Sequence, residues 1–414
     1  MRRRTGAPYG GAMRTLVTGA TGYVGSRLVT ELLAAGHDVV VASRTPDRLK
    51  LFGWYADVTP VHLDVLDQES TAAALQSLAP VDVVYYLVHS IGQDDFRDTD
   101  NQAAHNLAVA AGRAEVTRIV YLGGFVPDGD RLSEHLTSRA EVARELQVPD
   151  GPELVWLKAA VVIGAGSTSF EMVRYIGDRL LLIPMPSWVD NPMEPISIRD
   201  VLYYLVAAAE PELPAGAYDI SGGQPTTYRG LITSYLDAVG KYRVGVPIPL
   251  VSTKIAAQIG SVLVPVPTGL AADLVVSLDH PMVAGEHRIR GIVPDPSWGL
   301  TGMDDAVEAS VTSMPPRPVN RLIDPHHLAD SDPVWAGGDW PHIRLVGSHA
   351  LGSGLWKSIE NLGGRAVLSR WPVAAPVRVG LDAGLDVLDA GLGALGSLAG
   401  RVADAGRSSR RRAE

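Results

Sequence analysis

The stretch Thr15–Gly25, which reads TLVTGATGYVG, decides the fold of this chain. It opens with a short apolar run typical of a buried strand, and leucines and valines at helical spacing follow over residues 28–33. Between them, Gly19 allows a tight turn, Gly22 a close approach of the backbone to a diphosphate, and Gly25 close packing of the helix on the sheet. The spacing predicts a dinucleotide site at the helix N-terminus, the alternative being a strand–turn–helix unit without a ligand. The predicted contacts here are Gly19, Thr21, Gly22, Tyr23, Val24 and Gly25.

Composition limits the classes of protein to consider. The chain has 414 residues, which suggests two or three domains, and its 46% hydrophobic residues suffice for a substantial core. A net charge of -10 argues against nucleic acid as the main partner. The absence of cysteine excludes disulfides and thiol catalysis and fits a cytoplasmic location. We expect a small-molecule substrate and a monomer or homodimer.

Strand and helix patterns alternate over residues 13–165. This alternation predicts an α/β fold, a doubly wound parallel sheet with helices on both faces, in which ligands bind beyond the carboxyl ends of the strands. The predicted strands are Arg14–Thr18, Asp38–Ser43, Pro60–Leu63, Val81–Val88, Arg118–Leu122 and Leu154–Val162.

Two arginines follow the second predicted strand. A site that prefers NAD usually carries an acid here to hold the ribose hydroxyls, whereas this chain has Arg44 and, one helical turn later, Arg48. Because a guanidinium pairs well with a phosphate, we predict that NADP(H) is preferred, with NAD(H) also accepted. The alternative is that both arginines are solvated surface residues.

The residues after the third and fourth strands are the next candidates. Asp64 and Val65 are placed to meet the adenine edge. Val88 and His89 should run past the cofactor ribose, and Ser90 is a candidate for substrate binding. For His89, contact with the substrate and simple capping of the strand remain equal alternatives.

Five segments together resemble the atypical, extended short-chain dehydrogenase/reductases. The resemblance covers roughly residues 13–310 and includes the NmrA-like proteins, the nucleoside-diphosphate-sugar epimerase-like proteins and the NADPH-binding accessory subunit of respiratory complex I. It implies an NAD(P)-binding Rossmann domain and places Lys158 at the cofactor. The segments are GATGYVG (19–25), SRTPDR (43–48), HLDVLD (62–67), YYLVHSIG (85–92) and KAAVVIGAGS (158–167).

The chain departs from this family where catalysis is expected. Typical members have a serine after the fifth strand and a Tyr-x-x-x-Lys pair on the next helix, whereas this chain has Gly123 and Gly124 and no such pair. His135 and Arg139 have the same i, i+4 spacing, so they are the candidate catalytic residues, with the histidine as proton donor. Alternatively the pair is structural, and the domain binds its cofactor without ordinary alcohol chemistry.

Residues 166–314 are predicted to form a smaller substrate lobe, interleaved with the first sheet through a strand at Ala217–Ser221. Its apolar, proline-punctuated stretch 244–278 is either a lid over a lipophilic substrate or ordinary helical core. Thr168, Ser169 and Glu171 either line the nicotinamide end or merely start a helix. Besides Ser90, the predicted substrate contacts are Gly124, Ser167, Glu171 and Trp188.

The two ends of the chain have distinct compositions. Either Met13 is the true start or residues 1–12 are a flexible extension, and residues 315–370 are predicted to be a linker or wrapping arm. The histidines and aspartates of the arm match no metal-ligand spacing, so they are interpreted as surface residues and no metal site is predicted. Residues 371–414 predict an amphipathic helical tail with a basic end, which either contacts anionic lipid peripherally or is solvated.

These observations favour an NADP(H)-dependent oxidoreductase acting on a small or lipophilic organic molecule. A non-catalytic, NmrA-like NADP(H) sensor or scaffold is the alternative. A nucleoside-diphosphate-sugar epimerase or dehydratase is a third hypothesis, and the missing Tyr-x-x-x-Lys pair counts against it.

Overall fold

The computed structural model describes residues 11–90, 95–126, 134–248, 251–253, 268–312, 314–333 and 335–338. The predicted tail, residues 371–414, and all but the end of the predicted N-terminal extension lie outside these ranges. Within the described part of the chain, every helix is too short or too polar to cross a bilayer.

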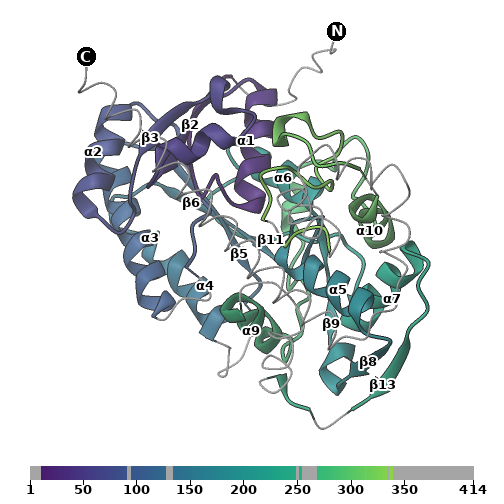
Figure 1. The fold of residues 1–414 in the computed structure, drawn as a ribbon. Helices are drawn as coiled ribbons and strands as arrows, with labels where there is room; N and C mark the ends of the chain where they lie inside the picture. Colours follow the sequence, from purple (N-terminus) through teal and green to yellow (C-terminus); the bar gives the residue numbers. More distant parts are fainter. Residues whose placement is uncertain are drawn as a thin grey trace, which may run out of the picture.

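A seven-stranded parallel sheet forms the centre of the molecule (Figure 1). Its order, β11-β6-β5-β4-β1-β2-β3, reverses direction beside β1, which is the doubly wound arrangement predicted from the alternating pattern. The strands are β1 (Arg14–Thr18), β2 (Asp38–Ser43), β3 (Thr59–His62), β4 (Val83–Tyr86), β5 (Arg118–Gly124), β6 (Glu153–Ala159) and β11 (Gly216–Asp219).

Helices cover both faces of this sheet because alternate strand residues point to opposite sides. On one face Val17 packs with residues of α1 and α6, and on the other Leu16 packs with residues of α2 and α3. Figure 1 shows α2, α3 and α4 on one side of the sheet and α1 and α6 on the other. These helices are α1 (Tyr23–Ala35), α2 (Gln68–Leu78), α3 (Phe96–Arg113), α4 (Glu134–Glu145) and α6 (Ile198–Ala207).

The predicted strands are confirmed with small changes at their ends. The first two have the predicted bounds, whereas the predicted strand Leu154–Val162 is divided into β6 and the short β7 (Val162–Ile163). The predicted return of the chain to the first sheet is also confirmed, because β11 pairs in parallel with β6 at the sheet edge. The smaller lobe is therefore interleaved with the sheet.

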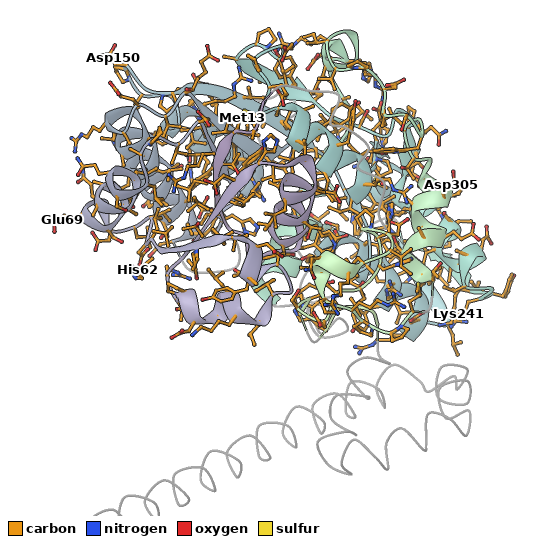
Figure 2. All side chains as sticks on the ribbon, turned by 90° about the horizontal axis from the view of Figure 1, so that it is seen from above. Met13, His62, Glu69, Asp150, Lys241 and Asp305 are labelled. Carbon is orange, nitrogen blue, oxygen red and sulfur yellow. The ribbon has the colours of Figure 1, made fainter. Side chains whose placement is uncertain are left out.

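The smaller lobe has its own apolar core, in which Phe170, Ile183, Leu231 and Met282 pack together. Figure 2 shows Glu69 and Asp150 towards one end of the molecule, and Lys241 and Asp305 towards the opposite end, in the smaller lobe. Its helices are α5 (Thr168–Arg179), α7 (Tyr228–Ala238), α9 (Thr268–Ser277) and α10 (Met303–Val311). Its short strands are β8 (Leu182–Met185), β9 (Pro192–Met193), β10 (Ile196–Ser197), β12 (Thr226–Thr227) and β13 (Val244–Pro247).

The segment 315–338 packs against both parts of the molecule, and here one prediction is wrong. His326 and Asp332 were expected at the surface, yet His326 is fully buried and the Asp332 side chain is 3% exposed. Asp332 forms an ion pair with Arg27 of α1, with 2.7 Å between Oδ2 and Nη2. His326 Nε2 lies 2.8 Å from the Ser197 hydroxyl before α6. Burial of these polar side chains is possible because each has a partner on another segment: Asp332 pairs with Arg27, and His326 with Ser197.

The turn between α1 and β2 supplies a pH-dependent contact. His37 is buried and accepts a hydrogen bond from the Met13 N–H through Nδ1, and burial lowers its pKa. Because the unfolded chain then takes up the proton more readily, stability should fall as the pH drops below about 6.5, by at most about 1.4 kcal/mol per pH unit. Urea titrations between pH 7 and 5 measure the free energy of unfolding at each pH. This free energy should change less steeply with pH in His37→Gln than in the wild-type protein. The control His62→Gln, at an exposed histidine of β3, should keep the wild-type slope.

Candidate functional site

The glycine turn after β1 is shaped by contacts that no larger residue would allow. Gly19 has a φ of +73°, and a Cβ added there would lie 2.4 Å from the Leu87 carbonyl oxygen at the end of β4. A Cβ on Gly25 would lie 2.3 Å from the Gly19 carbonyl oxygen. The turn therefore holds α1 directly against the ends of β1 and β4, where dinucleotides bind in such sheets.

The N-terminus of α1 suits an anion. Gly22 is the N-cap residue and has no side chain to cap the first N–H groups of the helix. Tyr23 and Val24, the first residues of α1, line a cavity. These open N–H groups and the helix dipole fit the diphosphate of a dinucleotide, so the glycine turn and the first turn of α1 would hold it.

The predicted adenine contacts lie beyond the ends of β2 and β3. Arg44 and Arg48 are exposed, and neither pairs with another side chain in the described ranges, so both guanidinium groups are available to a phosphate. Asp64 accepts a hydrogen bond from the Leu66 N–H. Asn106 of α3 donates to the Val65 and Leu66 carbonyl oxygens and thereby fixes this loop. The structure thus places Arg44 and Asp64 at neighbouring strand ends, as the sequence predicts.

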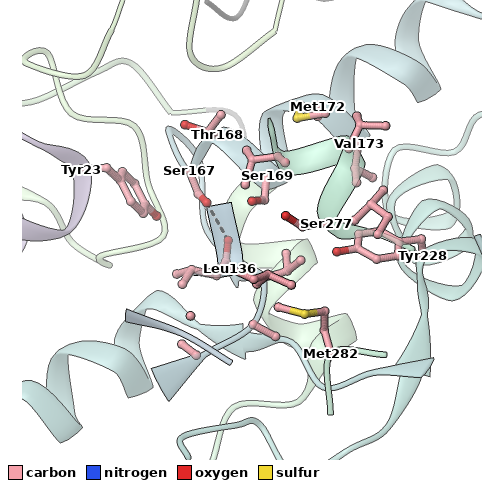
Figure 3. A pocket seen from close by; sticks show the side chains of 18 of the residues that line it. Tyr23, Leu136, Ser167, Thr168, Ser169, Met172, Val173, Tyr228, Ser277 and Met282 are labelled. Carbon is pink, nitrogen blue, oxygen red and sulfur yellow. Dashed lines mark hydrogen bonds between the residues drawn. The ribbon is translucent and has the colours of Figure 1, made fainter. Parts of the chain in front are cut away.

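A cavity of about 350 Å³ extends from the glycine turn into the smaller lobe (Figure 3). It is lined at one end by the glycine turn and β5 and at the other by α5, α7 and α9, and most of its wall is apolar. Apolar residues that line it include Leu87, Leu122, Leu136, Val161, Met172, Val173, Ile176, Ile183, Trp188, Ile232, Leu274 and Met282.

Two basic side chains lie on the wall of this cavity near the sheet. Arg139 of α4 passes 4.0 Å from the position of a Cβ on Gly124, next to the end of β5. His89 is accessible from the cavity but enclosed by protein atoms, and this enclosure together with the Arg139 charge lowers its pKa to about 3. His89 is therefore neutral at physiological pH and can donate or accept one hydrogen bond, while Arg139 carries a fixed positive charge.

An acid on α3 supports this part of the wall. Asp100 is 3% exposed and accepts a hydrogen bond from the Ser90 N–H, with 2.7 Å between the nitrogen and Oδ1. Burial raises its pKa, while the Ser90 hydrogen bond and the Arg139 charge oppose that effect. Asp100 thus fixes the backbone that follows His89. Asp100 was not among the residues predicted for the site.

Several predicted site residues line the cavity together, although they come from distant parts of the sequence. This arrangement brings the glycine turn, the end of β5 and the start of α5 to one surface. The predicted residues that line it are Gly19, Gly22, Tyr23, Val24, Gly25, His89, Gly124, Arg139, Ser167, Thr168, Ser169 and Trp188. His135 lies in α4, and its side chain is outside the described residues.

Other predicted residues lie elsewhere. Lys158 pairs with Asp219 of β11, with 2.6 Å between Nζ and Oδ1. Glu171 is fully buried and accepts hydrogen bonds from the Gly166 and Gly337 N–H groups, so its carboxylate ties the start of α5 to the arm. The residues that do not line the cavity are Thr21, Arg44, Arg48, Asp64, Val65, Val88, Ser90, Lys158 and Glu171.

The residues that close the far side of the cavity were not predicted from the sequence. Tyr228, Ile232 and Met282 lie more than 100 residues beyond the glycine turn, and nothing in the local pattern distinguishes them from ordinary core. The apolar stretch 244–278 was the one signal available, and Leu274 and Val275 of that stretch do line the cavity.

Comparisons with known proteins agree with this site. Residues 19–146 match the family model described as NAD(P)H-binding. The chain is 25% identical over 279 residues to the mitochondrial NADH dehydrogenase [ubiquinone] 1 alpha subcomplex subunit 9 of Arabidopsis thaliana, covering 64% of this chain and 67% of that protein. It is 26% identical over 252 residues to a 3-beta-hydroxysteroid dehydrogenase of Mycolicibacterium neoaurum, covering 51% of this chain and 66% of the relative.

Solved structures show the same fold. A nucleoside-diphosphate-sugar epimerase from Staphylococcus aureus superposes with a TM-score of 0.56 at 18% identity, covering 72% of this chain and all of the other. The Bordetella bronchiseptica enzyme WbmG, in complex with NAD and UDP, gives a TM-score of 0.55 at 19% identity over 73% of this chain and 94% of its own.

The fold and the glycine turn define a Rossmann-type NAD(P)-binding protein. Residues 19–146 match an NAD(P)H-binding domain, and the chain shares the fold of the nucleoside-diphosphate-sugar epimerase structures, in agreement with the resemblance seen in the sequence.

Proposed function

We propose that this protein is an NADPH-preferring oxidoreductase that acts on a lipophilic organic molecule. The observation that carries the proposal is the continuity of the cavity, which joins the glycine turn to a largely apolar chamber in the smaller lobe. A dinucleotide whose diphosphate lies on α1 would extend its nicotinamide into this cavity, beside the chamber. The similarity to the Mycolicibacterium neoaurum 3-beta-hydroxysteroid dehydrogenase supports an apolar substrate.

Arg139 and His89 are the groups that would act on the reacting oxygen or double bond. A bound nicotinamide supplies hydride when it is reduced. The fixed charge of Arg139 would stabilise negative charge that develops on a substrate oxygen, and the neutral His89 ring would donate or accept one hydrogen bond beside it. The alkoxide or enolate left by hydride transfer would take its proton from water, so this arrangement would support reduction of a carbonyl or a polarised double bond without the Tyr-x-x-x-Lys pair.

A cofactor titration tests the proposal. We expect wild-type protein to bind NADPH more tightly than NADH, because the exposed Arg44 lies at the end of β2 and can pair with the 2′-phosphate. Arg44→Ala should weaken NADPH binding about tenfold to 100-fold, as expected for a hydrogen bond to a charged group, and leave NADH binding unchanged. Calorimetry with both dinucleotides measures this difference.

The matched control is Arg113→Ala. Arg113 is also an exposed arginine, but it ends α3 shortly before β5 begins, at the amino ends of the parallel strands. Equal losses of NADPH affinity in both variants would mean that the Arg44 effect reflects only the change in net charge. Arg44 would then not explain a preference for NADPH. If wild-type protein binds neither dinucleotide, the oxidoreductase proposal fails.

A non-catalytic NADP(H) sensor or scaffold is the second candidate, and one observation favours it. β5 ends in Gly123 and Gly124, which supply no hydroxyl where typical family members have serine. The sugar-nucleotide alternative is weaker, because Arg139 is the one arginine or lysine among the described residues that line the cavity, and a nucleoside diphosphate needs more positive charge. If the protein turned over any substrate and this turnover required Arg139, the hypothesis of a non-catalytic sensor would be excluded.

A further inference from the structure

Ser169 and Tyr228 bring hydroxyl groups to the largely apolar chamber of the smaller lobe, whose lining also includes Thr168 and Ser277. Ser169 comes from the first turn of α5 and Tyr228 from the first residue of α7. Figure 3 shows both side chains at the cavity, with Tyr228 on the side opposite Tyr23, which marks the glycine turn. The Tyr228 hydroxyl therefore lies on the far side of the cavity from the glycine turn, with Ser169 between Tyr23 and Tyr228.

The surroundings of Tyr228 make its hydroxyl available to a ligand. Its ring packs on the lobe core that contains Ile232 and Met282, both of which also line the cavity. Within the described ranges neither the Tyr228 nor the Ser169 hydroxyl has a hydrogen-bond partner. Burial raises the pKa of Tyr228, so the phenol remains a hydrogen-bond donor at physiological pH.

We propose that Ser169 and Tyr228 form a second polar subsite, which binds a carbonyl or hydroxyl oxygen at the end of a lipophilic ligand remote from the reacting centre. An apolar chamber gains affinity by burying hydrocarbon, whereas a few placed polar groups fix orientation. The ligand class is then an elongated apolar molecule with oxygen functions at both ends. This deepens the proposed function, since it assumes that the same cavity holds the substrate.

The test uses 6-propionyl-2-dimethylaminonaphthalene, an apolar fluorophore with one carbonyl whose emission shifts to the red when it accepts a hydrogen bond. We expect wild-type protein to bind it with red-shifted emission. Tyr228→Phe should bind it about fivefold more weakly and shift the emission to the blue, as expected for the loss of one hydrogen bond. Ser169→Ala should change both readouts in the same direction.

The control is Tyr218→Phe, because the Tyr218 hydroxyl donates to the Pro214 carbonyl oxygen and does not line the cavity. It should match wild type in both readouts. Wild-type affinity and emission in Tyr228→Phe, or no binding to wild-type protein, would overturn the subsite. A separate NADPH titration distinguishes the two proposals: if NADPH fails to bind while the Tyr228→Phe difference persists, the subsite stands and the oxidoreductase function falls.

Discussion

Replacing Gly25 by alanine is expected to reduce the affinity for NADPH by roughly 100-fold, equivalent to about 3 kcal/mol. The added Cβ would lie 2.3 Å from the Gly19 carbonyl oxygen and 2.9 Å from the Ala20 Cα. Both contacts are with backbone, which cannot rotate away, so α1 must move from the end of β1. That movement displaces the helix N-terminus on which the diphosphate depends.

Gly291→Ala is the matched control, because a Cβ at Gly291 has no atom within 4 Å. It should keep wild-type NADPH affinity. Calorimetric titration of the three proteins makes the comparison, and circular dichroism confirms that the Gly25→Ala protein remains folded. Unchanged NADPH affinity in a folded Gly25→Ala protein would show that the close approach of α1 to β1 is not needed for binding.

Asp332→Ala should destabilise the fold by about 3–5 kcal/mol, the usual cost of leaving one partner of a buried ion pair uncompensated. The side chains of Arg27 and Asp332 are 2% and 3% exposed. Arg27 also donates to the Pro325, His327 and Ala165 carbonyl oxygens, so its charge cannot move to solvent without releasing the segment 315–338. Urea unfolding followed by circular dichroism measures the change in free energy.

The control for this prediction is Asp190→Ala. Asp190 also pairs with an arginine, Arg229, at 2.6 Å, but the two side chains are 54% and 42% exposed. Exposed pairs contribute about 0–1 kcal/mol, so this variant should remain close to wild type. If the two variants lost similar amounts of unfolding free energy, burial would not explain the contribution of the Arg27–Asp332 pair to stability.

Much of the first domain could be predicted because its signals are local. The residues of β1, the glycine turn and α1 are contiguous, and Gly19 and Gly25 are required by contacts within that unit or with the residue that follows β4. The parallel sheet followed from alternation alone. The position of Arg44 was also predictable, since the residue after β2 is fixed by the sheet order.

The roles of Lys158 and Glu171 were not predictable from local sequence. Lys158 follows the family segment, but its ammonium pairs with Asp219, which reaches it only because β11 returns to the edge of the sheet. Glu171 has the spacing of a helix-start acid, and its buried carboxylate in addition holds Gly337 of the arm. Both partners lie at least 60 residues away in sequence, so no spacing rule connects them.

The sequence by itself determined the doubly wound sheet, the glycine turn and the choice of a dinucleotide as ligand, because these depend on short-range periodicity and on residues within one strand–turn–helix unit. Only the tertiary structure decided the shape of the cavity, the burial of the Arg27–Asp332 pair and the placement of Tyr228 opposite the glycine turn. The physical reason is that these features arise where segments distant in sequence pack together, and their residues are individually indistinguishable from surface or core residues until that packing is known.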